Sequence, residues 1–257
     1  MFSVSVAWIA TAGRPLQASR PSPSVCSLVR RGIALRERWG SVEPSGFEFE
    51  SDWSIGDGRQ GWSNWLISDR LMLGQYPGSQ PAQVGPNVAD GLRHVQLLLS
   101  AAAVDCFACV QAEVPPQDDA SCWVDGAAQG FGHYLPTIRT LEIETGARAS
   151  VKYLHYPIAE GMAPTDVLGE AERSGPLLAL LDQMLLHYEG GGRAIYLHSW
   201  AGCGRAGLVG ASLLSLLRPD LEVTALLEWV QELCQKQGGS GDRGLSYASS
   251  AELSGLL

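Results

Sequence analysis

Residues 194–207, AIYLHSWAGCGRAG, decide the fold of this chain. The apolar run that opens the stretch predicts a buried strand, and the apolar run that begins near Arg205 predicts a helix. Gly202, Gly204 and Gly207 let the backbone between them turn so that successive N–H groups face one point. The N-terminus of the following helix adds positive potential at that point. The stretch therefore predicts a strand, an anion-binding loop and a helix, in that order.

Short apolar segments alternate with helical patterns along the rest of the chain. Strands are predicted over 70–75, 104–111, 151–158 and 194–198, and helices over 91–102, 134–147, 175–192, 206–217 and 224–235. This alternation favours parallel strands joined by helical crossovers. We therefore predict an α/β fold, with a mainly parallel central sheet flanked by helices on both faces. Ligands bind beyond the carboxyl ends of the strands in such folds, which is where the loop after residue 198 lies.

Composition limits the classes of function. With 257 residues, of which 46% are hydrophobic, the chain is long enough to bury a substantial core. Residues 1–36 contain five arginines and no acidic residue, so the remainder carries 13 basic against 27 acidic residues, a net charge of −14. This strong net negative charge argues against nucleic acid as the main partner. No apolar run approaches the length of a membrane-spanning helix, so no membrane span is predicted.

The N-terminal quarter of the chain has no sustained periodicity. Residues 1–40 are basic, rich in serine and nearly free of acids, which is typical of an organellar transit peptide, and the alternative is a disordered tail. Residues 41–61 are interpreted as a linker or covering arm, and residues 62–257 as the folded domain. The expected location is a chloroplast or mitochondrion, and otherwise the cytoplasm.

The cysteines do not suggest a metal site. Six cysteines are present, but their spacing shows no pairing of pairs of the kind that binds zinc. Cys106 and Cys109 lie three positions apart in a predicted strand, so their side chains should point to opposite faces. We expect them to be buried structural thiols. No metal and no cofactor are predicted.

The loop itself resembles a known signature. HSWAGCGR, residues 198–205, is similar to the HCxxGxxR motif of cysteine-dependent protein tyrosine and dual-specificity phosphatases, with Ser199 in place of the cysteine. PIAEGMAP, residues 157–164, resembles the PIxDGxxP general-acid loop of the dual-specificity branch, with Glu160 in place of Asp. RLMLGQYPGS, residues 70–79, is similar to the strand and turn that open these domains. The resemblance covers roughly residues 62–237 and implies a dual-specificity-phosphatase-like fold.

The resemblance assigns a role to each residue of the loop. It makes Ser199 the nucleophile position, Glu160 the candidate general acid and His198 the residue that orients the loop. The implied phosphate-binding residues are Ser199, Trp200, Ala201, Gly202, Cys203, Gly204 and Arg205. The planar guanidinium of Arg205 suits a bidentate grip on two phosphate oxygens.

The replaced cysteine determines the expected activity. Loop amides and a helix N-terminus lower a thiol pKa from about 8.5 to below neutral, but they cannot make an alkoxide of Ser199. Cys203 is a poor substitute nucleophile, because loop side chains face away from a ligand that the amides face. Hydrolysis should therefore be negligible, whereas phosphate binding needs only the amides and Arg205. The sequence predicts a pseudophosphatase that binds a phosphomonoester.

Other interpretations stay open. Retention of the loop and the acid also fits an active phosphatase represented by a Cys-to-Ser variant. WAGCGRA, residues 200–206, resembles the CxAGxGRA variant of plant glucan phosphatases, in which Ala206 is tolerated, and this makes the partner either a phosphorylated protein or a phosphoglucan. A third possibility is an interaction domain whose pocket is a relic.

Overall fold

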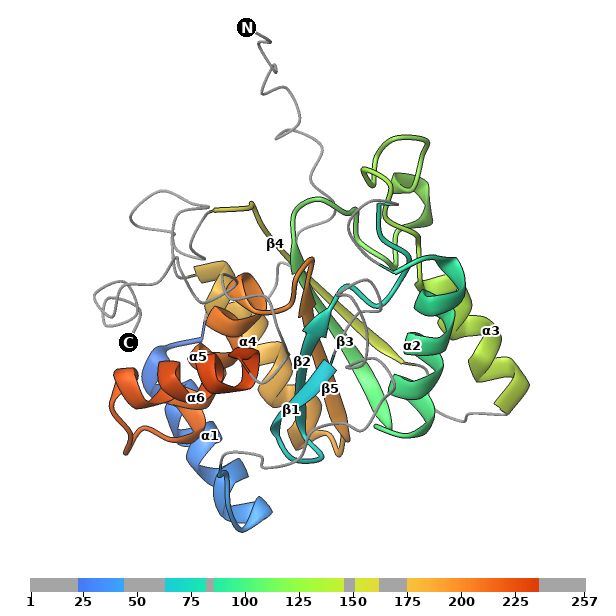
Figure 1. Cartoon of the computed structure of the whole chain (residues 1–257). Helices are drawn as coiled ribbons and strands as arrows, with labels where there is room; N and C mark the ends of the chain where they lie inside the picture. The colour runs from blue at the N-terminus through green and yellow to red at the C-terminus, as the bar shows by residue number, and fades with distance from the viewer. Residues whose placement is uncertain (1–22, 44–62, 82–85, 146–150, 162–174, 236–257) are drawn as a thin grey trace, which may run out of the picture.

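The computed structural model describes residues 23–43, 63–81, 86–145, 151–161 and 175–235. Its centre is a five-stranded sheet in the order β1-β2-β5-β3-β4 (Figure 1). The strands are β1 (Ser63–Ile67), β2 (Leu71–Gln75), β3 (Val104–Gln111), β4 (Lys152–Ile158) and β5 (Ala194–Ser199). β2, β5, β3 and β4 run parallel, and β1 is antiparallel to β2. The predicted mainly parallel sheet is confirmed, and β1 is an edge strand that the sequence analysis missed.

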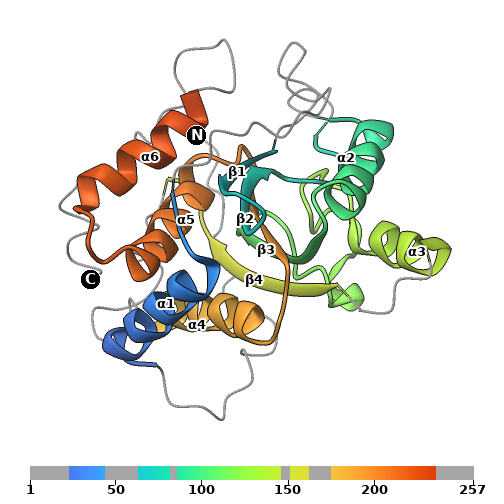
Figure 2. The same ribbon diagram turned by 90° about the horizontal axis from the view of Figure 1, so that it is seen from below.

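Helices cover both faces of the sheet, as predicted (Figures 1 and 2). One face carries α1 (Val25–Trp39), α4 (Gly175–Glu189), α5 (Gly204–Leu217) and α6 (Val223–Gln235), and the other carries α2 (Val88–Ser100) and α3 (Leu135–Thr145). A short 3-10 helix, η3 (Ala120–Cys122), lies between β3 and α3. Within the described part of the chain, no helix is both long enough and apolar enough to cross a membrane.

Two separate clusters of buried side chains form the core, one on each face of the sheet. Cys106 belongs to the cluster under α4 and α5, whereas Cys109 belongs to the cluster under α2 and α3. The predicted opposite orientation of these thiols is therefore confirmed. Both are fully buried, and burial raises the pKa of each to about 12. They are inert packing groups at physiological pH.

α1 contradicts the prediction that residues 1–40 form only a transit peptide or disordered tail. Ser24 caps this helix, and Leu28, Gly32 and Leu35 form its buried stripe. A Cβ on Gly32 would lie 2.6 Å from the carbonyl carbon of Leu216, so the backbones of α1 and α5 are in contact. Residues 25–39 are thus part of the folded domain. Residues 1–22 and 44–62 lie outside the described residues, so the targeting prediction for residues 1–22 stays a prediction, as does the linker or covering-arm prediction for residues 41–61, of which the structure describes only 41–43.

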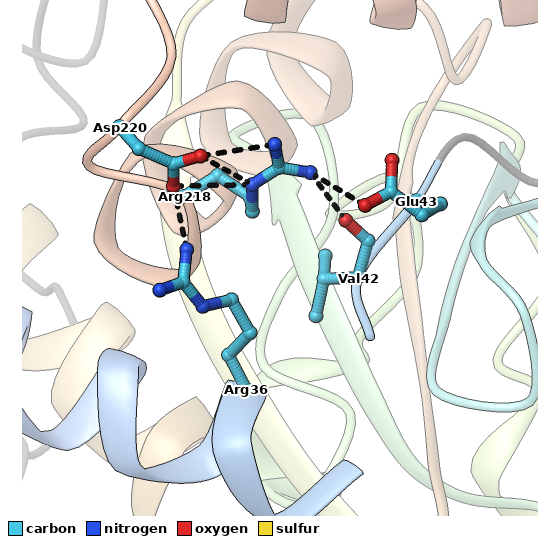
Figure 3. Close-up of polar contacts among 5 residues, drawn as sticks. All are labelled: Arg36, Val42, Glu43, Arg218 and Asp220. Atoms are coloured by element: carbon cyan, nitrogen blue, oxygen red, sulfur yellow. Dashed lines mark hydrogen bonds and ion pairs between the residues drawn. The ribbon is translucent and has the colours of Figure 1, made fainter. Parts of the chain in front are cut away.

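An ionic cluster joins the end of α1 to the end of α5 (Figure 3). Asp220 accepts hydrogen bonds from Arg36 at 2.5 Å and from Arg218 at 3.0–3.2 Å. Arg218 also donates to the carbonyl of Val42 at 2.7 Å and to Glu43 at 3.2 Å. The hydrogen bonds from Arg218 lower the pKa of the Asp220 carboxyl to about 2. Because α5 begins at the predicted phosphate loop, α1 supports the helix that carries the site.

Candidate functional site

The predicted phosphate loop lies at the carboxyl end of the parallel strands (Figure 1). β5 ends at Ser199 and α5 begins at Gly204, so four residues make the turn. Gly202 takes a φ of +83°, and a Cβ there would lie 2.5 Å from the carbonyl oxygen of Gly74 and 2.8 Å from the amide nitrogen of Gln75. Only glycine fits both the conformation and the space. The loop therefore rests directly on the backbone of β2.

The hydroxyl of Ser199 lies beneath this turn. Ser199 is 2% exposed, and its Oγ accepts a hydrogen bond from the N–H of Gly202 at 3.2 Å. An anionic atom in the same position would face a loop amide and the N-terminus of α5, which both favour negative charge. Among the contacts of the described residues, no carboxylate or imidazole reaches Oγ, so the hydroxyl has no base to activate it.

His198 precedes Ser199 on β5 and points to the opposite face of the sheet. Its ring is fully buried, with Nε2 2.8 Å from the hydroxyl of Tyr134. The ring also lies edge-on to Tyr76 and stacks on Tyr196. Burial holds the pKa of this imidazole well below its usual value, so it is neutral. A neutral, packed ring can orient the loop but cannot act on a ligand on the other face.

Arg205 is paired with a carboxylate that sequence reasoning missed. Its Nη1 donates to both carboxylate oxygens of Glu113 at 2.7 Å and to the carbonyl of Ile158 at 2.8 Å. The two side chains are only 11% and 10% exposed. Among the described residues, no hydrogen bond occupies Nε or Nη2 of Arg205, so these donors are available to an oxyanion. Glu113 lies two residues after β3, at the edge of the sheet that carries the loop. This position was the only signal in the sequence that could have identified Glu113 as a partner of Arg205.

The remaining loop residues differ in their surroundings. Trp200 is half-buried and packs edge-on against Phe131, with ring centroids 5.1 Å apart. Its carbonyl accepts a hydrogen bond from the N–H of Tyr76 at 3.3 Å. Ala201 is exposed, whereas Cys203 is buried and its carbonyl accepts the N–H of Gly207. The loop is thus fixed at both ends and open at its middle.

Glu160 lies after β4, in an exposed turn in which Gly161 has a φ of +76°. β3 separates β4 from β5 in the sheet, and no contact among the described residues joins Glu160 to the loop. Residues 162–164 of the predicted general-acid loop lie outside the described residues. The structure therefore brings Glu113 to Arg205 in the loop that begins at Ser199, and it shows Glu160 at the same edge of the sheet without contact to the loop.

The described residues show no metal site at this edge or elsewhere, because they contain no group of three His, Cys, Asp or Glu side chains that could hold an ion. The donors that the site offers are backbone amides and a guanidinium. Such donors suit an oxyanion rather than a cation.

No family model matches the chain, and no curated protein matches it. Several solved structures are similar. Tk-PTP in its active form shares 18% identity over 73% of this chain and 90% of its own, with a TM-score of 0.41. PTPMT1 in complex with PI(5)P shares 14% over 66% and 82%, with a TM-score of 0.43. Kinase associated phosphatase with its catalytic-site cysteine replaced by serine shares 18% over 65% and 77%, with a TM-score of 0.43. These are distant likenesses.

Proposed function

We propose that the loop of residues 199–205 binds a phosphomonoester and does not hydrolyse it. The observation that carries this proposal is the position of Ser199 Oγ, 3.2 Å from the amide nitrogen of Gly202 in the loop that leads into α5. Arg205 lies in the first turn of the same helix, where Glu113 holds one of its terminal nitrogens. A helix N-terminus with a fixed guanidinium beside it is a strong site for phosphate.

The absence of a thiolate explains why binding is not followed by cleavage. A thiol in this position would be ionised by the amides and would attack phosphorus. The hydroxyl of Ser199 stays neutral and has no base among its described contacts. Loss of a nucleophile costs a hydrolase on the order of a millionfold in rate. A neutral hydroxyl also does not repel a phosphate dianion, so binding should be at least as strong as it would be beside a thiolate.

The class of partner follows from the motif and from charge. The phosphatase-like signature makes the partner a phosphorylated protein or a phosphoglucan. The acidic body of the chain, with its net charge of −14 beyond residue 36, disfavours a polyanionic partner, so a single phosphate on an otherwise neutral or basic molecule is preferred. Titration with a phosphotyrosine peptide and with a phosphorylated maltooligosaccharide separates the two classes.

Calorimetric titration with inorganic phosphate tests the binding itself. Arg205→Ala should weaken binding by at least tenfold, because it removes the charged donor. Arg139→Ala is the matched control, since Arg139 is 43% exposed on α3, and it should leave the affinity unchanged. Absence of phosphate binding, or equal affinity in both variants, contradicts the proposal.

Restoring the nucleophile tests the chemistry. Ser199→Cys should create turnover of an aryl phosphate, and Glu160→Gln in that background should lower the rate if Glu160 protonates the leaving oxygen. The unmodified chain should show no turnover. Activity of the unmodified chain that persists in Cys203→Ser would contradict the assignment of Ser199 as a lost nucleophile.

We propose an organellar location on the basis of the basic N-terminal residues. Residues 1–23 carry two arginines, Arg14 and Arg20, and no acidic residue, and residues 1–22 lie outside the described residues. Fusion of residues 1–23 to a fluorescent protein should direct it to a chloroplast or mitochondrion. A purely cytoplasmic signal contradicts the targeting proposal and leaves the binding proposal intact.

A further inference from the structure

Gln117 lies between β3 and α3, and its amide group connects two tyrosines. The side chain is 1% exposed. Its Nε2 donates to the hydroxyl of Tyr76 at 2.8 Å, and its Oε1 accepts the backbone N–H groups of Tyr134 at 3.1 Å and Leu135 at 3.3 Å. Both the donor and the acceptor group of one buried amide are therefore hydrogen-bonded, and each of them binds a different segment of the chain.

Each of these tyrosines in turn holds one side of the phosphate loop. The hydroxyl of Tyr134 lies 2.8 Å from Nε2 of His198, the residue before Ser199. The backbone N–H of Tyr76 donates to the carbonyl of Trp200, the residue after Ser199, at 3.3 Å. Gln117 thus lies at the point where two hydrogen-bonded paths to the loop meet.

We propose that Gln117 is a positioning residue of the phosphate site, which fixes the loop through Tyr134 and His198 on one side and through Tyr76 and Trp200 on the other. The inference rests on the proposed function and assigns one more residue to the same site. Buried hydrogen bonds of this kind hold their side chains in place, and the network loosens when one member is removed. The consequence at the loop is a loss of amide alignment toward the ligand.

The contact with Tyr76 is what distinguishes this role from ordinary support of the fold. Oε1 of Gln117 satisfies N–H groups at the start of α3, which any helix needs. Nε2 serves no helix end, because it fixes the hydroxyl of Tyr76, which itself donates to the carbonyl of Gly132 at 2.7 Å. This second contact holds Tyr76, whose backbone N–H donates to the carbonyl of Trp200 in the phosphate loop.

The test measures loop alignment without a ligand. In the Ser199→Cys background, the pH dependence of alkylation of the introduced thiol gives its pKa, which aligned amides hold below about 8.5. Gln117→Met keeps the length of the side chain but removes all three hydrogen bonds of its amide, and it should raise this pKa by about one unit, which is tenfold in the ionisation equilibrium. Leu98→Ala is the control for general destabilisation, since Leu98 is fully buried in the same cluster and belongs to α2. It should leave the thiol pKa unchanged.

Two hydroxyl deletions keep the test decisive if Gln117→Met fails to fold. Tyr134→Phe and Tyr76→Phe each remove one contact of a path, and each should raise the thiol pKa. The inference is overturned if the folded Gln117→Met protein, or both tyrosine variants, keep the thiol pKa of the parent. Failure of the unmodified chain to bind inorganic phosphate would instead overturn the proposed function, and the thiol measurement would still decide the role of Gln117.

Discussion

Substitution of Gly202 by alanine is the sharpest test of the loop geometry. Gly202 has a φ of +83°, and a left-handed backbone costs a residue with a Cβ about 1–2 kcal/mol. The added methyl would also lie 2.5 Å from the carbonyl oxygen of Gly74, which is closer than van der Waals contact. β2 cannot move aside, because β1 and β5 hold it on both edges, so overpacking adds about 1–3 kcal/mol. The free energy of unfolding should therefore fall by about 2–5 kcal/mol.

Urea denaturation of Gly202→Ala and Gly204→Ala gives the comparison. A Cβ on Gly204 would meet no atom within 4 Å, and its φ is not positive, so this variant should be unchanged or slightly stabilised by its higher helix propensity. Phosphate affinity should fall by at least tenfold in Gly202→Ala, because the methyl pushes the loop amides away from β2. Equal unfolding midpoints for the two variants would refute the close approach of loop and strand.

Three further outcomes are expected. Glu113→Ala leaves Arg205 buried without its carboxylate and should lower the free energy of unfolding by about 3–5 kcal/mol in urea; an unchanged midpoint would contradict the pairing. Gly32→Val should separate α1 from Leu216 and make residues 24–43 more sensitive to limited proteolysis than they are in the parent protein; equal sensitivity argues against the contact. Burial lowers the pKa of His94 from 6.5 to about 3, so between these pH values only the unfolded chain binds a proton at His94. The free energy of unfolding should therefore fall by roughly 5 kcal/mol in total as the pH is lowered from 6.5 to 3. His94→Gln should flatten the pH dependence of the urea midpoint, and identical slopes would contradict the prediction.

The central strands and the loop could be predicted because local signals agree there. β5 is a continuous apolar run, Gly202 turns the chain after it, and α5 resumes an apolar pattern from Gly204. The same agreement of run length and flanking turns located β3 and β4. β3 and β5 are buried on nearly their whole length, so their sequences carry the apolar pattern almost without interruption, whereas the edge strand β4 is only partly buried.

α1 was missed because its composition hid its periodicity. Its buried stripe consists of Leu28, Gly32 and Leu35, and glycine is not counted as an apolar position although it allows the closest contact with α5. The surrounding arginines suggested a transit peptide instead. Ser24 before the helix and Gly40 after it were the signals that could have corrected this, since serine caps and glycine ends a helix.

Glu113 and Gln117 could not be assigned from the sequence, because their partners are distant along the chain. Glu113 and Arg205 are 92 positions apart, and the contact exists only because β3 and β5 are neighbours in the sheet. Gln117 lies in a polar segment that has the composition of an ordinary loop. Its burial depends on the packing of Tyr76 and Tyr134 around it, which no local pattern reveals.

The position of α1 limits how far the chain can be shortened from its N-terminus. A recombinant fragment that starts at residue 41 would lack the layer that covers α5, and it would expose the apolar surface on which Leu28 and Leu35 are buried. Such a fragment should aggregate, because newly exposed apolar area drives association. A fragment that starts just before Ser24 keeps the helix cap and the whole layer. By the same reasoning, any leader that an import machinery removes from this protein has to end before Ser24.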